Sequence, residues 1–323
     1  MSFPAAANRR KEHGSPVGHP GRLPPYTTFN DYAVTGTDEH PSAGTERTPL
    51  APVLAEATLD LAAAGVDSPR VDAELLAAHV LGVNRGRLAL IDTIRDVELR
   101  RFAGLIAARA ERIPLQHLMG TAAFRHLELA TGQGVFVPRP ETELLAGWGI
   151  AHTAPGATVV DLGSGTGAIA LSVVDEARPG RVIAVERSPA ALAWLRRNAA
   201  GTAVQVVAGD ITDPDLLRDE RGRVDVVLCN PPYVPDGTAV PPEVGAHDPA
   251  EAVFGGADGL AVIRPVIALA AALLRPGGVV GIEHDDVHAE AVPGLLRADG
   301  RFAEVTDHDD LAGRPRYATG RRV

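Results

Sequence analysis

The chain has 323 residues, 45% of them hydrophobic and 22% charged, and its formal net charge at pH 7 is −10. This length favours two domains, and the acidic balance argues against an extended phosphate-binding surface without excluding a local basic groove. The single cysteine, Cys229, excludes disulfides within the chain and a cysteine-rich metal site. No apolar run reaches the length of a membrane span, and the N-terminus lacks the apolar core of a secretion signal. We therefore expect a cytoplasmic protein.

The first part of the chain changes character near residue 48. Residues 1–47 are rich in Pro, Gly, Ser, Thr and charge, which predicts a disordered extension. Residues 48–118 carry apolar side chains at helical spacing and are predicted to form a small helical domain. Its helices are marked by the start and stop signals Ser68-Pro69, Gly82, Asn84 and Asp96. Because no cluster of catalytic residue types lies in this domain, we expect it to dock a protein substrate.

A short β segment is predicted to link two domains. Apolar residues lead into Gly132-Gln133-Gly134 and then Val135-Phe136-Val137, which predicts a β-hairpin within residues 119–140. The segment Pro138–Glu143, of sequence PRPETE, follows directly. It is either a rigid entry into the next helix, with acidic residues in the first turn, or a part of the active site.

The second domain, residues 141–323, opens with a glycine-rich loop. The stretch Ala157–Leu171, ATVVDLGSGTGAIAL, predicts a buried strand, a loop and a helix. Its spacing is G-x-G-x-G, whereas dinucleotide folds carry G-x-G-x-x-G. Glycines let the backbone pass close under a ligand, and this form suits S-adenosylmethionine, whose amino-acid end carries an ammonium and whose adenosine carries no phosphate. The predicted cofactor-binding residues here are Asp161, Gly163, Ser164, Gly165, Thr166 and Gly167.

Two further predicted strands end in acidic residues. Glu186 ends the strand Arg181–Val185, where a carboxylate can accept both ribose hydroxyls of a nucleoside. Asp210 follows the strand Ala203–Val207 and, with Ile211, can meet an adenine amine and ring face. Because the carboxyl ends of parallel strands meet at one edge of a sheet, acids at successive strand ends favour a ligand site over simple strand-end capping.

The stretch Val224–Tyr233, VDVVLCNPPY, is the strongest candidate for the reacting site. Its apolar run predicts a buried strand that two prolines end abruptly. The Asn230 side-chain carbonyl and the Pro231 backbone carbonyl provide two acceptors aimed at one spot, while Tyr233 supplies a flat face and Pro232 holds the turn. Such a site fits a planar NH2 group, either an amide or the exocyclic amine of a base. Asn230, Pro231 and Tyr233 are therefore the predicted catalytic residues, these three and Pro232 bind the substrate, and Asn230 also borders the cofactor.

No metal site is predicted. His247 lies in a Pro/Gly-rich loop, but no second histidine stands at ligand spacing. The sequence leaves open whether Arg139, Glu141 or His247 contributes to the site. Two closing strands are predicted near residues 301–307 and 315–321.

The order of these motifs is similar to that of class I methyltransferases. The series runs DLGSGTGAIAL, Glu186, Asp210, NPPYVP, GGADGL and LLRPGG. NPPY alone is shared with adenine-N6 and guanine-N2 methyltransferases, so it indicates the reaction type only. The segment IPLQHLMG…FRHLEL…GVFVPRPETELL and the helical domain resemble, more narrowly, the release factor glutamine N5-methyltransferase family of HemK/PrmC type. The sequence departs from that family in Glu186, where Asp is frequent, and in Ile211, where some members carry an aromatic residue that would stack on adenine.

The resemblance implies an α/β fold: a Rossmann-like, seven-stranded class I methyltransferase sheet, joined by a β-hairpin to the helical domain. It implies methyl transfer from S-adenosylmethionine to the glutamine side-chain amide in the GGQ motif of peptide chain release factors, which act in translation termination. The expected partner is the GGQ-containing domain, with no direct nucleic acid, no membrane and a monomeric enzyme. A nucleic-acid amine methyltransferase is the main alternative, but the flanking domain is not conspicuously basic. A non-catalytic cofactor-binding adaptor is the other, and the intact NPPY beside an intact glycine loop argues against it.

Overall fold

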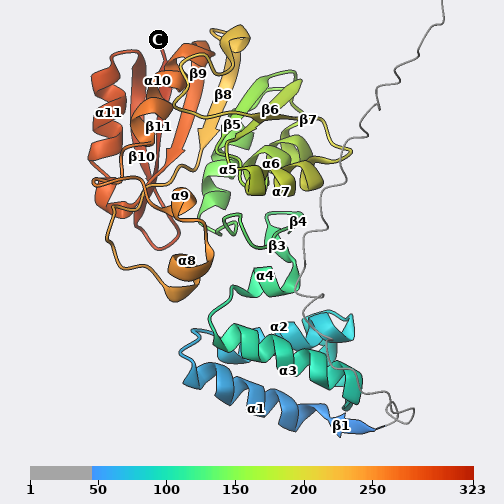
Figure 1. The fold of residues 1–323 in the computed structure, drawn as a ribbon. Coiled ribbons are helices and arrows are strands. Elements are labelled where there is room, and N and C mark those ends of the chain that lie inside the picture. The colour runs from blue at the N-terminus through green and yellow to red at the C-terminus, as the bar shows by residue number, and fades with distance from the viewer. Residues whose placement is uncertain (1–45) are drawn as a thin grey trace, which may run out of the picture.

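The computed structural model describes residues 46–323. The predicted disordered extension therefore lies, apart from its last two residues, outside the described residues. From Glu46 onward the chain forms a helical domain, a short hairpin and a large α/β domain, arranged in this order along the molecule (Figure 1).

The helical domain packs three long helices around an apolar core. Leu61, Leu76 and Phe102, one from each of these helices, are almost completely buried there. The elements of this domain are β1 (Arg47–Pro49), α1 (Leu50–Ala63), α2 (Pro69–Leu81), η2 (Arg85–Leu90), β2 (Thr93–Arg95), α3 (Asp96–Ala110) and α4 (Leu115–Met119).

The start and stop signals of these helices act largely as predicted. Gly82 ends α2 in the left-handed conformation, with φ 64°. The Asn84 side chain accepts a hydrogen bond from the Arg87 backbone N–H at 3.2 Å and starts the short helix η2. Asp96 was expected to cap the last long helix but lies inside its first turn. Glu98 caps the N-terminus of this helix instead, because its carboxylate accepts a hydrogen bond from the Arg95 backbone N–H at 3.1 Å.

The hairpin is present, but the prediction of its strands was wrong. β3 (Thr121–Phe124) pairs antiparallel with β4 (Leu127–Ala130), so the turn falls at Arg125-His126 and not at the glycines of residues 132–134. Arg125 takes the left-handed conformation, with φ 52°, and no glycine marks the place. Its guanidinium holds the turn against helix α6 (Ala168–Ala177), where it binds both carboxylate oxygens of Glu176 at 2.6 and 2.7 Å. A long-range ion pair thus replaces the local turn signal that the sequence reading relied on.

The α/β domain contains one seven-stranded sheet of order β10-β11-β9-β8-β5-β6-β7. β5, β6, β7, β8 and β9 run parallel, whereas β11 pairs antiparallel with both of its neighbours. The strands are β5 (Thr158–Leu162), β6 (Arg181–Glu186), β7 (Val204–Ala208), β8 (Val224–Cys229), β9 (Leu274–Glu283), β10 (Phe302–Asp309) and β11 (Pro315–Arg322). This is the predicted class I methyltransferase arrangement, with the two closing strands where the sequence placed them.

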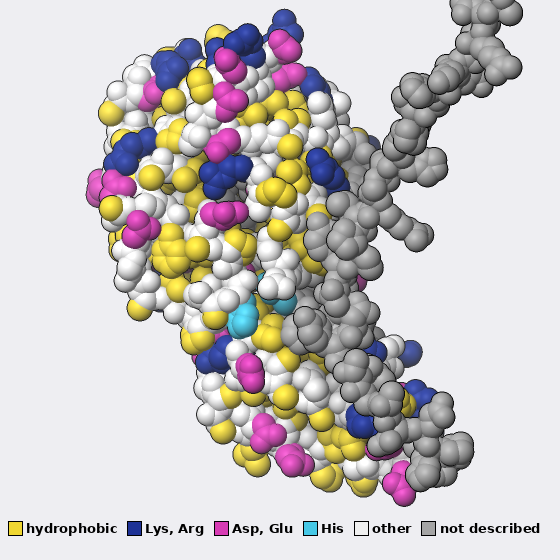
Figure 2. All heavy atoms as spheres, in the orientation of Figure 1, with side chains coloured by type: hydrophobic (Ala, Val, Ile, Leu, Met, Phe, Trp, Pro, Cys, Tyr) yellow, Lys and Arg dark blue, Asp and Glu magenta, His cyan; other side chains and the backbone are white. Residues whose placement is uncertain are grey.

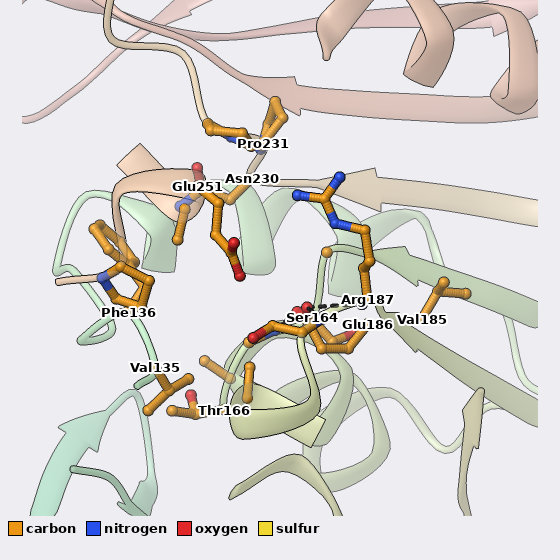
Figure 3. A pocket seen from close by; sticks show the side chains of 18 of the residues that line it. Val135, Phe136, Ser164, Thr166, Val185, Glu186, Arg187, Asn230, Pro231 and Glu251 are labelled. Carbon is orange, nitrogen blue, oxygen red and sulfur yellow. Dashed lines mark hydrogen bonds between the residues drawn. The ribbon is translucent and has the colours of Figure 1, made fainter. Parts of the chain in front are cut away.

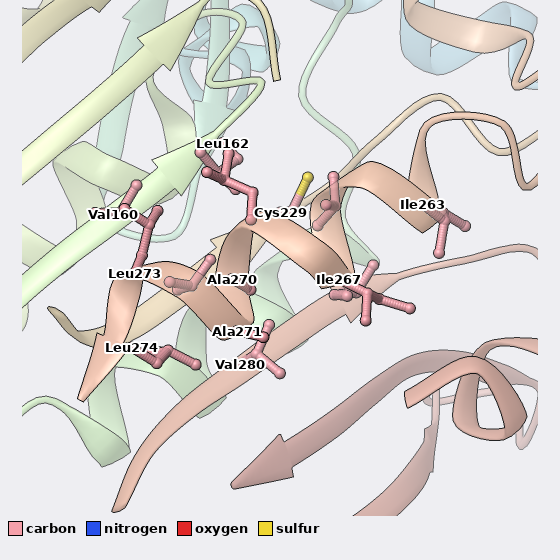
Figure 4. Close-up of a cluster of buried hydrophobic side chains, with 14 of the residues drawn as sticks. Val160, Leu162, Cys229, Ile263, Ile267, Ala270, Ala271, Leu273, Leu274 and Val280 are labelled. Carbon is pink, nitrogen blue, oxygen red and sulfur yellow. The ribbon is translucent and has the colours of Figure 1, made fainter. Parts of the chain in front are cut away.

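Helices cover both faces of the sheet, so its central strands are buried on both sides. Successive residues of β5 show this, because Val159 packs with α5, α6 and α7 whereas Val160 packs with α10 and α11. Figure 4 shows the second of these clusters, in which Cys229 lies with Ile267 and Val280. The remaining elements are α5 (Thr142–His152), α6 (Ala168–Ala177), α7 (Pro189–Ala199), η3 (Arg218–Glu220), α8 (Pro242–His247), α9 (Ala250–Val253), α10 (Ile263–Leu273), η4 (Asp286–His288) and α11 (Ala291–Asp299). Within residues 46–323, no helix combines the length and the apolar character needed to cross a membrane.

Candidate active site

A cavity opens where β5, β6, β7 and β8 end, and the strand register brings the predicted motifs to it. Leu162 is paired with Val185 on one side and Cys229 on the other, so the residues that follow these three emerge next to one another. Figure 3 shows Ser164 and Glu186 on one wall of the cavity and Asn230 on another. The predicted site residues that line it are Gly163, Ser164, Gly165, Thr166, Glu186, Asp210, Ile211, Asn230, Pro231 and Pro232.

The three glycines of the loop serve two purposes. Gly163 and Gly165 line the cavity in the left-handed conformation, with φ 74° and 55°, which side chains disfavour. Gly167 lies behind the loop, at φ 88°, and a Cβ there would stand 2.8 Å from the Leu195 Cδ1 atom. Glycine is therefore required at 167 by the packing of α6 on α7, whatever its part in ligand binding.

Asp161 lies beneath the loop with only 1% of its surface exposed. Its Oδ2 accepts from the Ser164 hydroxyl at 2.7 Å and from the Ala170 backbone N–H at 3.2 Å. Its Oδ1 has no hydrogen-bond partner among the described residues. Burial raises the pKa of this carboxyl to about 7, although the bonds from Ser164 and Ala170 oppose the shift. Asp161 does not itself line the cavity, so it meets the site from beneath the loop, through Ser164. Its unpaired Oδ1 is a buried acceptor that a cationic group of a ligand would satisfy.

The two other acidic residues are already hydrogen-bonded to the protein. Glu186 accepts from the backbone N–H groups of Gly165 at 2.9 Å, Arg187 at 2.7 Å and Ser188 at 2.8 Å, so it fastens the glycine loop to the end of β6. Asp210 accepts from the Thr212 backbone N–H and hydroxyl at 2.8 and 2.7 Å, and these bonds lower its pKa. Both carboxylates keep unused lone pairs that a ribose hydroxyl or an adenine amine could meet.

The amide of Asn230 is held in one orientation. Its Nδ2 donates to the Thr142 hydroxyl at 3.0 Å. Thr142 belongs to the PRPETE segment and is the first residue of α5. The nitrogen end of the amide is thereby engaged by the protein. Among residues 46–323, no donor contacts its oxygen end, which can therefore accept a hydrogen bond from a ligand in the cavity.

Tyr233 faces a second hollow that adjoins the first. This hollow is also lined by Asn230 and Pro231, and by residues of α8 and the loop before it, Val240, Pro241 and Val244. The Tyr233 hydroxyl donates to Glu283 at the end of β9, at 3.1 Å. Asn230 and Pro231 therefore stand at the junction between two hollows, one bordered by the glycine loop and one by Tyr233.

The structure adds residues that the sequence reading missed or left open. Thr142, Arg187 and Glu251 all line the first cavity, and Figure 3 shows Arg187 and Glu251 on different walls. Arg139 borders both hollows, forms an ion pair with Asp248 and lies over the Phe136 ring, with 4.7 Å from its Cζ to the ring centroid. The proximity of PRPETE to the family motifs was the available signal for Thr142 and Arg139, whereas nothing local marked Glu251. No cluster of potential metal ligands is found among residues 46–323.

Comparison with known proteins identifies the family. Residues 52–120 match the model of the PrmC N-terminal domain, and residues 141–246 match that of the methyltransferase small domain. The release factor glutamine methyltransferase of Mycolicibacterium smegmatis is 55% identical over 277 residues, which are 85% of this chain and 99% of that protein. The chain belongs to the release factor glutamine methyltransferase family.

Two further matches are less similar in sequence. The Mycobacterium tuberculosis release factor glutamine methyltransferase is 46% identical over 81% of this chain and 88% of its own length. Among solved structures, the Thermus thermophilus 16S rRNA N2 G1207 methyltransferase RsmC, in complex with AdoMet and guanosine, is 23% identical. That likeness covers 63% of this chain and 50% of RsmC, with a TM-score of 0.46.

Proposed function

We propose that this enzyme transfers a methyl group from S-adenosylmethionine to the side-chain amide nitrogen of the GGQ glutamine in peptide chain release factors. The observation that carries the proposal is the fixed amide of Asn230, whose free oxygen stands beside Pro231 where the two hollows meet. A methyl donor bound in the first hollow and a substrate amide entering from the second would meet at this point.

The first hollow suits S-adenosylmethionine. Glu186, which lines the hollow, would accept hydrogen bonds from the ribose hydroxyls. The unpaired Oδ1 of Asp161, which lies beneath the glycine loop and outside the lining, would receive the ammonium of the amino-acid end. Asp210 and Ile211 would hold the adenine. When bound, the cofactor supplies an electrophilic methyl group on a sulfonium sulfur.

An amide nitrogen is a poor nucleophile because its lone pair is delocalised into the carbonyl. If the Asn230 Oδ1 and the Pro231 carbonyl accept its two N–H bonds, the nitrogen is turned toward the methyl carbon in line with the departing sulfur. The same two acceptors stabilise the positive charge that grows on nitrogen as the N–C bond forms and the C–S bond breaks. Tyr233 would pack on the amide plane. The nitrogen would then lose a proton to solvent water, and the products would be the N5-methylated glutamine and S-adenosylhomocysteine.

We further propose that the release factor docks across the helical domain and the second hollow, as a protein substrate of a monomeric, cytoplasmic enzyme. An ion cluster joins the two: Arg109 contacts Asp72 at 2.7 Å and Glu243 of α8 at 2.9 Å, and Arg112 contacts Glu243 at 2.7 Å. Burial opposes the ionised form of Glu243, but hydrogen bonds from Arg112 and Arg109 outweigh it and lower its pKa to about 2. On the face shown in Figure 2, arginines alternate with acidic side chains, which suits a protein better than a nucleic-acid backbone.

The test is methyl transfer from labelled S-adenosylmethionine to purified release factor, with a copy whose GGQ glutamine is changed to alanine as the control. Label on the intact protein only is the expected result, and label on neither protein would contradict the proposal. Asn230→Ala should lower turnover by about 100- to 1000-fold, the usual effect of losing one preorganised polar contact in a transition state. Cofactor affinity should change little, because Asp161 and Glu186 are untouched.

A further inference from the structure

The two polar atoms of an asparagine amide have opposite hydrogen-bonding roles, and the proposed reaction requires that the oxygen of Asn230 face the substrate. The Oδ1 atom accepts hydrogen bonds, whereas the Nδ2 atom donates two. An amide substrate that offers N–H groups needs the oxygen toward it. If the Asn230 amide were flipped, its Nδ2 donors would face the N–H donors of the substrate amide. The lone pair of the substrate nitrogen would then not be directed to the methyl group. Something outside the NPPY segment must therefore fix the orientation of Asn230.

Thr142 makes the direct contact. Its hydroxyl oxygen receives the Asn230 Nδ2 hydrogen at 3.0 Å, and the residue is 4% exposed. A hydroxyl carries a single hydrogen, which must point to another acceptor if the oxygen is to remain an acceptor for Asn230. Burial raises the pKa of Glu283 and the Thr142 hydroxyl opposes that shift, so we assign the Glu283 carboxylate as this second acceptor.

Glu283 completes the arrangement from the far side of the NPPY segment. It is 1% exposed at the end of β9 and also accepts from the Tyr233 hydroxyl at 3.1 Å. Burial raises the pKa of this carboxyl to about 7, and in its ionised form it can only accept, so both hydroxyls then give it their hydrogens. One acceptor thereby sets the direction of the Thr142 bond and anchors the Tyr233 ring. Its second oxygen, Oε2, has no hydrogen-bond partner among residues 46–323, so no donor competes there with the two hydroxyls.

We propose that Glu283 and Thr142 are positioning residues that keep the Asn230 oxygen turned toward the acceptor amide. The proposal rests on the proposed function for its effect on catalysis, but the orientation of Asn230 is a property of the protein alone. Neither residue needs to touch the substrate for this role. Glu283 acts indirectly, through the hydroxyl groups of Thr142 and Tyr233.

Three variants separate this role from simple structural support. Glu283→Gln is nearly isosteric but can present an NH2 donor to Thr142, which would reverse the hydroxyl and release Asn230. We expect kcat to fall about 100-fold, the scale of one misplaced polar contact, with the KM for the release factor and the Kd for S-adenosylmethionine close to wild type. Thr142→Val removes the hydroxyl at constant shape and should also lower kcat, whereas Thr142→Ser keeps the hydroxyl and should restore it.

A second readout needs no substrate. The sequence contains five asparagines, so the side-chain amide signals in a 1H–15N spectrum are few, and that of Asn230 is assigned by its loss in Asn230→Asp. The Asn230 signal should move in Glu283→Gln and in Thr142→Val and stay in place in Thr142→Ser. An unmoved signal in the first two variants would overturn the proposal, whatever the activity.

The two readouts together distinguish the possible failures. If wild type labels the release factor and Glu283→Gln keeps its kcat within about threefold, a free-energy change below 1 kcal/mol, the positioning role is refuted and the proposed function stands. If wild type labels no release factor, the proposed function fails and the Asn230 signal alone decides whether Thr142 and Glu283 orient the amide.

Discussion

Replacing Asp161 by asparagine removes the one buried charge that the cofactor site is proposed to need, and it should affect stability and binding in opposite directions. Asparagine keeps an oxygen that can accept from Ser164 and Ala170, the two donors that contact Oδ2 in the native protein. It replaces the unpaired Oδ1 by an uncharged NH2 group. The substitution therefore changes charge at nearly constant shape.

The magnitude follows from the pKa of about 7 in the folded protein against about 3.9 for an exposed aspartate. A raised pKa means that the folded state holds the proton more tightly. The protonated form then contributes stability below about pH 4, and this contribution is lost as the pH rises to 7. At about 1.4 kcal/mol per pH unit, the ionised carboxylate costs the fold on the order of 4 kcal/mol at pH 8. Without cofactor, Asp161→Asn should therefore be more stable than wild type at pH 8 and no more stable near pH 4.

Calorimetric titration with S-adenosylmethionine tests the expected effect of this substitution on cofactor affinity. Wild type should bind more tightly as the pH rises toward 7, by up to about tenfold per unit, because only the ionised carboxylate pairs with an ammonium. Asp161→Asn should bind weakly and with no such pH dependence. Asp175→Asn, which changes an exposed acid on α6, is the matched control and should behave as wild type. A wild-type affinity that stays flat from pH 5 to 7, or a variant that binds as tightly at pH 8, would refute the pairing.

Two further predictions concern the supporting structure. Glu243→Gln should raise the KM for the release factor several-fold and leave cofactor affinity unchanged, because it loosens Arg112 from α8 and with it a wall of the second hollow; steady-state kinetics with an unchanged KM would argue against this link. Gly149→Ala places a Cβ 2.4 Å from the Leu228 Cδ1 atom and should cost about 1–3 kcal/mol in urea unfolding. Gly104→Ala, which meets no atom within 4 Å on α3, should instead gain about 0.4–1 kcal/mol, and equal effects of the two changes would contradict the packing argument.

Local sequence determined most of the elements that carry chemistry. The apolar run of β8 ends at Asn230 because two prolines follow it, and the glycine loop follows β5 because Gly163 and Gly165 take backbone conformations that other residues disfavour. The sequence predicted that both strand ends reach the same edge of the sheet, and the structure adds that β5 and β8 are direct neighbours. Such features are readable because each depends on residues within a few positions of one another.

Contacts between distant segments could not be predicted in this way. The hairpin turn at Arg125 depends on Glu176, which lies 51 positions later, and it was misplaced because no glycine or asparagine marks it. The orientation of Asn230 depends on Thr142, 88 positions earlier, and the anchoring of Tyr233 on Glu283, 50 positions later. Sequence alone therefore determined which groups reach the edge of the sheet. Only the tertiary structure decided how they are turned, because a hydrogen bond's direction depends on partners that folding, and not chain order, brings within reach.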